Sequence, residues 1–299
     1  MLKLDRTALL IQGMAGFETL LLGFFKAFQE NNIMFKAIST EGASIKAAMI
    51  YSANYPIEKA LKEIKNANLF ATPPEAVFTN SYFNSTFHST SYFSYYNDIL
   101  TNNYSTPFSY HYKITEETIL IQKNMKIPVY TSIVNLLTGE HKTINLQEFD
   151  LEKKHLWLGT RIPYFKPVKI DGEIFIEDHF NNPPVNILLD KYNEIEKFII
   201  VRSYPKMSKP PSSLLELNDR ANDIAMNSYL DQQLYFIEKV NKWVKEGLLP
   251  KEKYRNIQIF SLNIDPEPLE YLDYRPSQLQ KKFDIGYKKG TELLRELNK

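Results

Sequence analysis

The sequence predicts an α/β fold in which a doubly wound, mainly parallel central sheet is flanked by helices. Two short apolar runs, Thr7–Gln12 and Ile33–Ile38, are each followed by a glycine-containing turn and then by a helical pattern. With 299 residues, 43% of them hydrophobic, the chain can bury such a sheet on both faces. We expect a single domain spanning residues 1–299, with a core at 7–205 and a C-terminal helical extension with one strand at 206–299.

Composition restricts the partners and the chemistry. A net charge of +1 provides no basic surface, so we expect no nucleic-acid partner. The absence of cysteine excludes disulfides, thiol nucleophiles and thiolate metal sites. The apolar segment 8–28 is interrupted by Gln12, Glu18 and Lys26, so we interpret it as a strand and a helix. The expected location is cytoplasmic, or exported without a cleavable signal peptide, and any membrane contact is expected to be peripheral.

The first strand leads through Gly13–Gly16 into a helix predicted over Phe17–Glu30. The second strand turns sharply at Thr40–Gly42 into another helix, which is the shape of a nucleophile elbow. A hydrolase elbow is written Gly-x-Ser-x-Gly, because a strained turn lifts one side chain above the sheet. In the frame Ser39-Thr40-Glu41-Gly42-Ala43, the tip of the elbow is the carboxylate of Glu41.

A long segment, Tyr82–Tyr112, is rich in serine, threonine, asparagine and aromatic residues and has no clear period. Insertions of this length are often lids or binding loops, which would make Tyr92, Phe93, Tyr95 and Tyr96 ligand contacts. An irregular segment whose rings cap the core is an equally good interpretation, and the sequence leaves both open.

The rest of the chain alternates between strands and helices. Predicted strands are Pro128–Asn135 and Lys142–Leu146, which form a hairpin, and Glu173–Ile176, Lys197–Ser203 and Ile257–Ile264. Predicted helices are Glu58–Lys65, a long helix that a Ser213-x-x-Glu216 capping box opens and Gly247 closes, and Ser277–Asn298.

The elbow and its surroundings resemble the patatin-like phospholipases, including bacterial members. The family's Ile-Gly-Thr-Ser-Ala-Gly-Ala-Ile-x-Ala-Ala aligns with Ile38–Ala48 without a gap, which places Glu41 at the nucleophilic serine. The family's oxyanion loop corresponds to Gly13, Met14, Ala15 and Gly16. The resemblance extends from Thr7 to about Leu297 and implies a lipid acyl hydrolase fold without metal or cofactor.

A second block, Ile162–Gly172 followed by Asn182–Pro184, also resembles this family. Its Asp-Gly-Gly, which carries the general base of the Ser-Asp dyad, corresponds to Glu177-Asp178-His179, so Glu177 takes the dyad-base position. Asp171 is a weaker candidate for the base, because it precedes the strand 173–176 instead of following it.

The nucleophile, the base and the oxyanion loop all depart from the family pattern, which predicts a catalytically impaired pseudoenzyme that binds a lipid or fatty-acyl ligand. Two facing carboxylates suit acyl transfer badly, since they repel each other and a glutamate nucleophile would form an anhydride.

Three alternatives stay open. One is an active lipid acyl hydrolase that uses a non-standard nucleophile such as Ser44. Another is a carboxylate metal site built from Glu41, Glu177, Asp178 and His179, although we expect no metal. The third is a protein-interaction module whose partner the sequence does not identify.

Overall fold

The structure is a computed structural model that describes residues 4–13, 17–42, 44–66, 115–151, 168–178, 183–202, 210, 214–264 and 275–298. Three of the predicted oxyanion-loop residues, Met14, Ala15 and Gly16, lie outside these ranges. The predicted lid residues Tyr92, Phe93, Tyr95 and Tyr96, and His179, also lie outside them.

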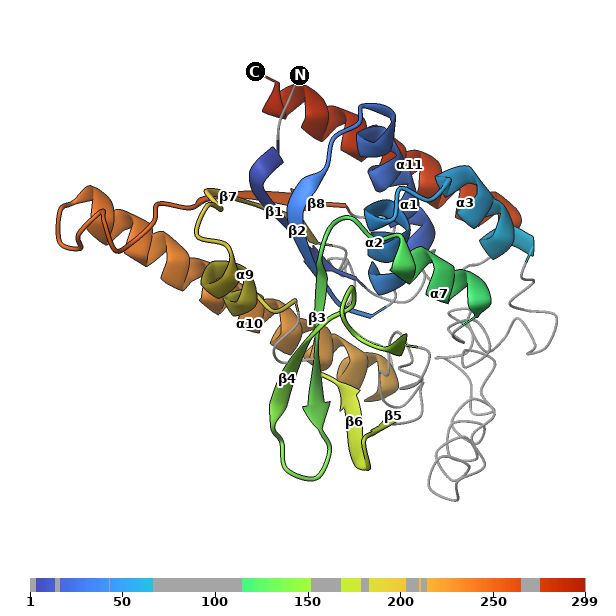
Figure 1. Cartoon of the computed structure of the whole chain (residues 1–299), viewed down its shortest axis with the longest axis horizontal. Helices are drawn as coiled ribbons and strands as arrows, with labels where there is room; N and C mark the ends of the chain where they lie inside the picture. Colours follow the sequence, from blue (N-terminus) through green and yellow to red (C-terminus); the bar gives the residue numbers. More distant parts are fainter. Residues whose placement is uncertain are drawn as a thin grey trace.

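An eight-stranded sheet forms the centre of the molecule, in the order β5-β6-β3-β2-β1-β7-β8, with β4 paired to β3 (Figure 1). Strands β1, β2, β3, β7 and β8 pair in parallel, whereas β4, β5 and β6 pair antiparallel. The prediction of an α/β fold with a mainly parallel sheet is therefore confirmed, and β2 lies near the middle as expected. The strands are β1 (Leu4–Gln12), β2 (Phe35–Thr40), β3 (Val129–Asn135), β4 (His141–Asn145), β5 (Val168–Ile170), β6 (Glu173–Glu177), β7 (Lys197–Arg202) and β8 (Gln258–Asn263).

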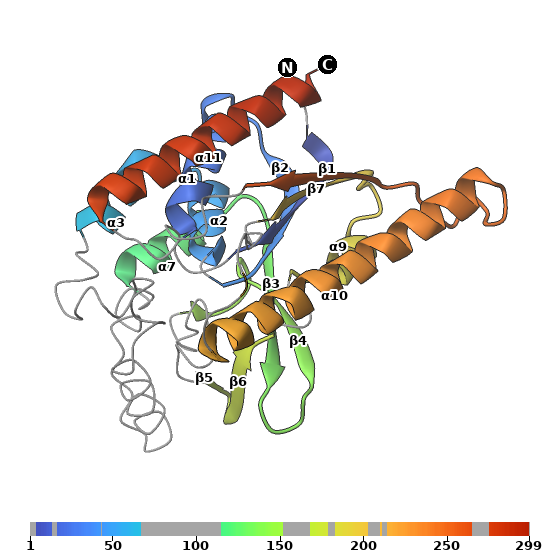
Figure 2. The same ribbon diagram turned by 180° about the vertical axis from the view of Figure 1, so that it is seen from behind.

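Helices cover both faces of the sheet, as Figures 1 and 2 show from opposite sides. One face carries α1 (Glu18–Glu30), α2 (Ser44–Ser52), α3 (Ile57–Asn66), α7 (Glu116–Lys123) and α11 (Pro276–Leu297). The other carries α9 (Asn186–Lys191) and the long α10 (Leu214–Lys245). Each face buries its own apolar cluster, because a parallel sheet has to be shielded from water on both sides.

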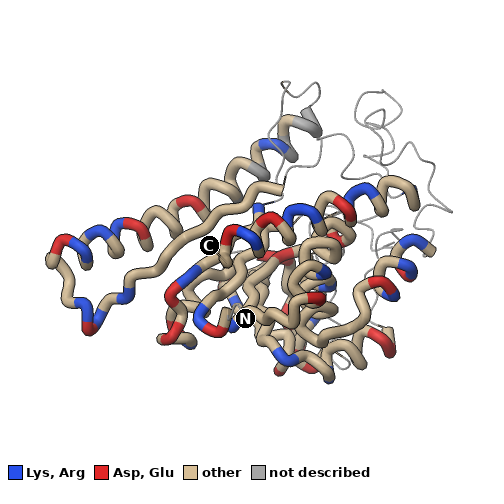
Figure 3. Tube along the Cα trace, turned by 90° about the horizontal axis from the view of Figure 1, so that it is seen from above, with Lys and Arg blue, Asp and Glu red and all other residues tan. Residues whose placement is uncertain are grey.

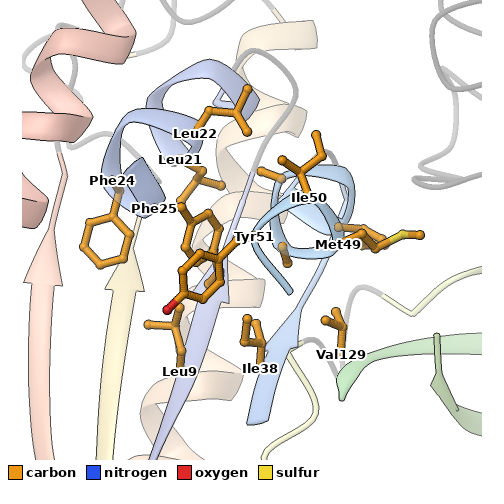
Figure 4. Close-up of a cluster of buried hydrophobic side chains, with 14 of the residues drawn as sticks. Leu9, Leu21, Leu22, Phe24, Phe25, Ile38, Met49, Ile50, Tyr51 and Val129 are labelled. Carbon is orange, nitrogen blue, oxygen red and sulfur yellow. The ribbon is translucent and has the colours of Figure 1, made fainter. Parts of the chain in front are cut away.

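The larger cluster includes residues of the two helices that follow the predicted oxyanion loop and the predicted elbow (Figure 4). The ring of Phe25 on α1 stacks on that of Tyr51 on α2, with ring centroids 4.4 Å apart. The hydroxyl of Tyr51 donates to the carbonyl of Ile33, just before β2. These contacts tie α1, α2 and the central strand into one packed unit.

The C-terminal helix α11 packs directly on α1, backbone against backbone. A Cβ added at Gly286 would lie 1.8 Å from the carbonyl oxygen of Leu20, and one at Gly23 would lie 1.9 Å from that of Phe283. Only glycine allows such close contact. The segment predicted as an extension thus supplies β8 to the sheet and α11 to the layer that holds α1.

Lysine and arginine alternate with aspartate and glutamate along the described helices and do not gather on one face (Figure 3). Of the helices that the structure describes, none combines the length and the apolar character needed to cross a membrane.

Candidate functional site

The predicted elbow lies between β2 and α2. Strand β2 continues to Thr40, two residues further than the sequence indicated, and α2 begins at Ser44. Gly42 has a φ of +54°, a left-handed conformation that favours glycine. The backbone amide of Ser44 donates to the carbonyl of Glu41 at 3.2 Å, which closes the turn. The sharp strand-to-helix turn therefore forms where the sequence predicts it.

Two hydroxyls clamp this turn. The Oγ1 of Thr40 and the Oγ of Ser44 lie 2.6 Å apart, and the Ser44 hydroxyl also donates to the carbonyl of Glu41. Ser44 is fully buried. Its proton is thus engaged by a backbone carbonyl, which is the behaviour of a serine that stabilises a helix start.

Strand pairing brings the loop after β1, the elbow and the end of β6 together: β1, β2 and β3 pair in parallel, and β6 pairs antiparallel with β3. A Cβ added at Gly42 would lie 3.1 Å from the carbonyl oxygen of Gly13 and 3.3 Å from Oε1 of Glu177. Glu177 reaches this place because β6 pairs with β3, with Glu177 opposite Ile133. Both Glu41 and Glu177 are buried. Three segments that the sequence nominated separately therefore meet at one edge of the sheet.

Gly13 is needed for this meeting. A Cβ there would lie 2.5 Å from the Oγ of Ser44 and 2.6 Å from its Cβ, closer than real atoms approach. The turn after β1 and the start of α2 thus fit each other only because residue 13 has no side chain.

Asp178, the neighbour of Glu177, makes contacts of its own that the sequence did not indicate. Its Oδ2 lies 2.7 Å from the Oγ of Ser132 on β3 and 2.7 Å from Nδ1 of His141 on β4. Its backbone amide donates to the carbonyl of Ser132 at 3.2 Å. Consecutive residues at a strand end point to opposite sides, so Glu177 faces the elbow while Asp178 faces the hairpin.

The sequence carries only a weak signal for the contacts of Asp178 with Ser132 and His141. That signal is the presence of hydroxyl and imidazole side chains on the two strands of the predicted hairpin. The register of that hairpin decides the contact, with Val134 opposite His141 and Ser132 opposite Thr143.

Among the described residues, no three histidine, aspartate or glutamate side chains gather as metal ligands. The other candidate base, Asp171, forms the exposed β5–β6 turn at the far end of β6.

Two further charged groups lie on α1 and α2, the helices that follow the loop after β1 and the elbow. Glu18 is buried in the first turn of α1, directly after the predicted oxyanion loop. Burial lowers the pKa of Lys46 on α2, and the negative charge of Glu18 acts in the opposite direction. Burial therefore opposes the charged form of Lys46, and the carboxylates of Glu18, Glu63 and Glu117 favour it.

Comparison with known proteins identifies no family for this chain. No protein-family model matches the sequence, and no curated protein matches it. Among solved structures, VipD from Legionella pneumophila superimposes with a TM-score of 0.43 at 11% identity, over 98% of this chain and 67% of that chain.

Proposed function

We propose that this protein is a catalytically impaired, acyl-ligand-binding protein that keeps the architecture of patatin-like lipid acyl hydrolases. One observation supports the loss of hydrolysis above the others. The elbow brings Gly42, a residue without a side chain, to Glu177. The two hydroxyls nearest to it in sequence, those of Thr40 and Ser44, are buried and bonded to each other.

Acyl transfer needs a nucleophile whose proton passes to a base as the new bond forms. Ser44 would have to give up its bonds to Thr40 and to the carbonyl of Glu41 before it could attack. A carboxylate attack by Glu41 would produce an anhydride close to the buried Glu177. Both routes suit ester hydrolysis badly.

The proposed ligand is a fatty acid or a lysolipid, because loss of the catalytic hydroxyl does not by itself remove an acyl-chain pocket. The aromatic segment that contains Tyr92, Phe93, Tyr95 and Tyr96 is the proposed roof of that pocket. Contact with a membrane would then be peripheral, at the place where the lipid enters.

Thermal melting tests the proposal. A ligand that binds only the folded state raises the melting temperature, by an amount equivalent to about 2.7 kcal/mol at 100 times its Kd. We expect oleate or lysophosphatidylcholine, below its micellar concentration, to raise the melting temperature. Deletion of residues 92–104 is expected to weaken that rise. A sugar detergent of similar chain length serves as the control for non-specific binding.

A parallel assay with a short p-nitrophenyl ester separates this proposal from its alternatives. We expect no turnover by the unmodified protein and none by Glu41→Ser. Ser44-dependent turnover would instead establish the hydrolase alternative. An unchanged melting temperature with every lipid tested would favour the protein-interaction alternative.

A further inference from the structure

We infer that Gly42, and not Glu41, occupies the place in this fold where a nucleophilic side chain would stand, with Glu177 as the carboxylate that would face it. The inference rests on the proposed function, in that it explains which side chain the non-hydrolytic site lacks. The inferred nucleophile position is residue 42, one residue later than the position that the resemblance to the patatin-like family indicates.

The backbone conformation is the first support. In a nucleophile elbow the reactive residue sits on the strained position of the strand-to-helix turn, where left-handed φ values are tolerated. Within the turn Thr40–Gly42, a positive φ occurs at Gly42 alone, at +54°. Glu41 precedes that position.

The direction of the missing side chain is the second support. The Cβ position of Gly42 lies 3.3 Å from Oε1 and 3.9 Å from Oε2 of Glu177, and 3.1 Å from the carbonyl oxygen of Gly13. The oxygen of a hydroxyl or the sulfur of a thiol at residue 42 is one covalent bond beyond Cβ. That bond would bring it into hydrogen-bonding range of the Glu177 carboxylate. This is the relation that a nucleophile and its general base require.

The residues around Gly42 give the third support. Thr40 and Ser44 stand two positions before and two positions after it, where an elbow carries its framing small residues. Their hydroxyls lie 2.6 Å apart and so join the two ends of the frame. Ser44 fits there because Gly13, which it touches, has no side chain. The frame is therefore Thr40-Glu41-Gly42-Ala43-Ser44.

The absence of cysteine from the chain allows a direct test, because Gly42→Cys and Glu41→Cys each introduce a single thiol. A carboxylate next to a thiol disfavours the thiolate and raises the thiol pKa. The thiol can be titrated by NMR with cysteine labelled at 13Cβ, which needs no reagent to enter a buried site. Each variant is compared with and without Glu177→Gln.

In the Gly42→Cys protein, we expect Glu177→Gln to lower the midpoint of thiol titration by about one pH unit or more. In the Glu41→Cys protein, we expect a clearly smaller change. An equal or larger change at position 41 would overturn the inference. No change at position 42 would also overturn it. Because this readout involves neither lipid nor ester turnover, its failure is distinguishable from failure of the proposed function.

Covalent labelling provides a second measurement. With a fluorophosphonate, the serine oxygen of Gly42→Ser would bond to phosphorus, fluoride would leave, and the proton would pass to Glu177. Intact-protein mass spectrometry should show label on Gly42→Ser, none on Glu41→Ser, and loss of label when Glu177→Gln is added. Label on Glu41→Ser alone, or none on a Gly42→Ser protein that melts cooperatively, would contradict the inference.

Discussion

Replacing Ser44 by alanine distinguishes a structural hydroxyl from a nucleophilic one. The change removes the bond to the hydroxyl of Thr40, 2.6 Å away, and the bond donated to the carbonyl of Glu41. That carbonyl keeps the backbone amide of Ser44 as a donor, so the Thr40 hydroxyl is the group that loses a partner. A buried polar group left unsatisfied costs about 1–3 kcal/mol, and we expect the free energy of unfolding to fall by about 2 kcal/mol.

Urea unfolding of Ser44→Ala, Thr40→Val and the double variant measures this effect as a double-mutant cycle. Because the double variant leaves no unpaired hydroxyl, it should lose less than the sum of the single variants, with a coupling of about 1 kcal/mol. A loss below about 0.5 kcal/mol for Ser44→Ala would refute the clamp. Ester turnover that disappears in Ser44→Ala would refute the structural interpretation.

Three further changes test other parts of the structure. Alanine normally stabilises a helix relative to glycine, but Gly286→Ala should cost about 1–3 kcal/mol in urea unfolding, because its Cβ would meet the carbonyl of Leu20 at 1.8 Å. Because burial lowers the pKa of Lys46, the unfolded chain binds more protons at alkaline pH, and stability should rise with pH as it approaches the ordinary lysine value of 10.5. Lys46→Met should abolish that contribution, as the slope of unfolding free energy against pH would show. Asp178→Ala should lower the free energy of unfolding by about 2 kcal/mol, because it removes the carboxylate that bonds both the hydroxyl of Ser132 and the imidazole of His141. It should leave the lipid-induced thermal shift unchanged.

Hydrophobic periodicity predicted most of the fold, because its long elements are strongly patterned. The strand expected at 197–203 is observed as Lys197–Arg202, and the helix expected at 277–298 as Pro276–Leu297. The elements it missed are short. Helix α7 starts with a capping box between Thr115 and Thr118, which lacks the glutamate or glutamine of the usual sequence signal. The three-residue β5 is too short to show a period.

The site was predicted in part. The meeting of Gly13 and the elbow follows from the parallel pairing of β1 with β2, which the alternation of elements already indicated, whereas Glu177 joins them through the antiparallel pairing of β6 with β3. The sequence does not show which residue of the turn has a positive φ, because matching residues to a motif does not determine their backbone dihedral angles. The positive φ of Gly42 is a backbone feature that the frame around Glu41 did not indicate. Likewise, the contact of Asp178 with His141 depends on hairpin register, which sequence patterns fix only loosely.

Binding of an acyl ligand is the central claim, and mass spectrometry of lipid extracted from the purified protein tests it most directly. The protein is purified without detergent, and the extract is compared with that of the variant lacking residues 92–104. We predict fatty acid or lysolipid in near-stoichiometric amount in the first sample and a clear reduction in the second. The claim would be contradicted if the extract contained no acyl lipid and added lipid also left the melting temperature of the protein unchanged.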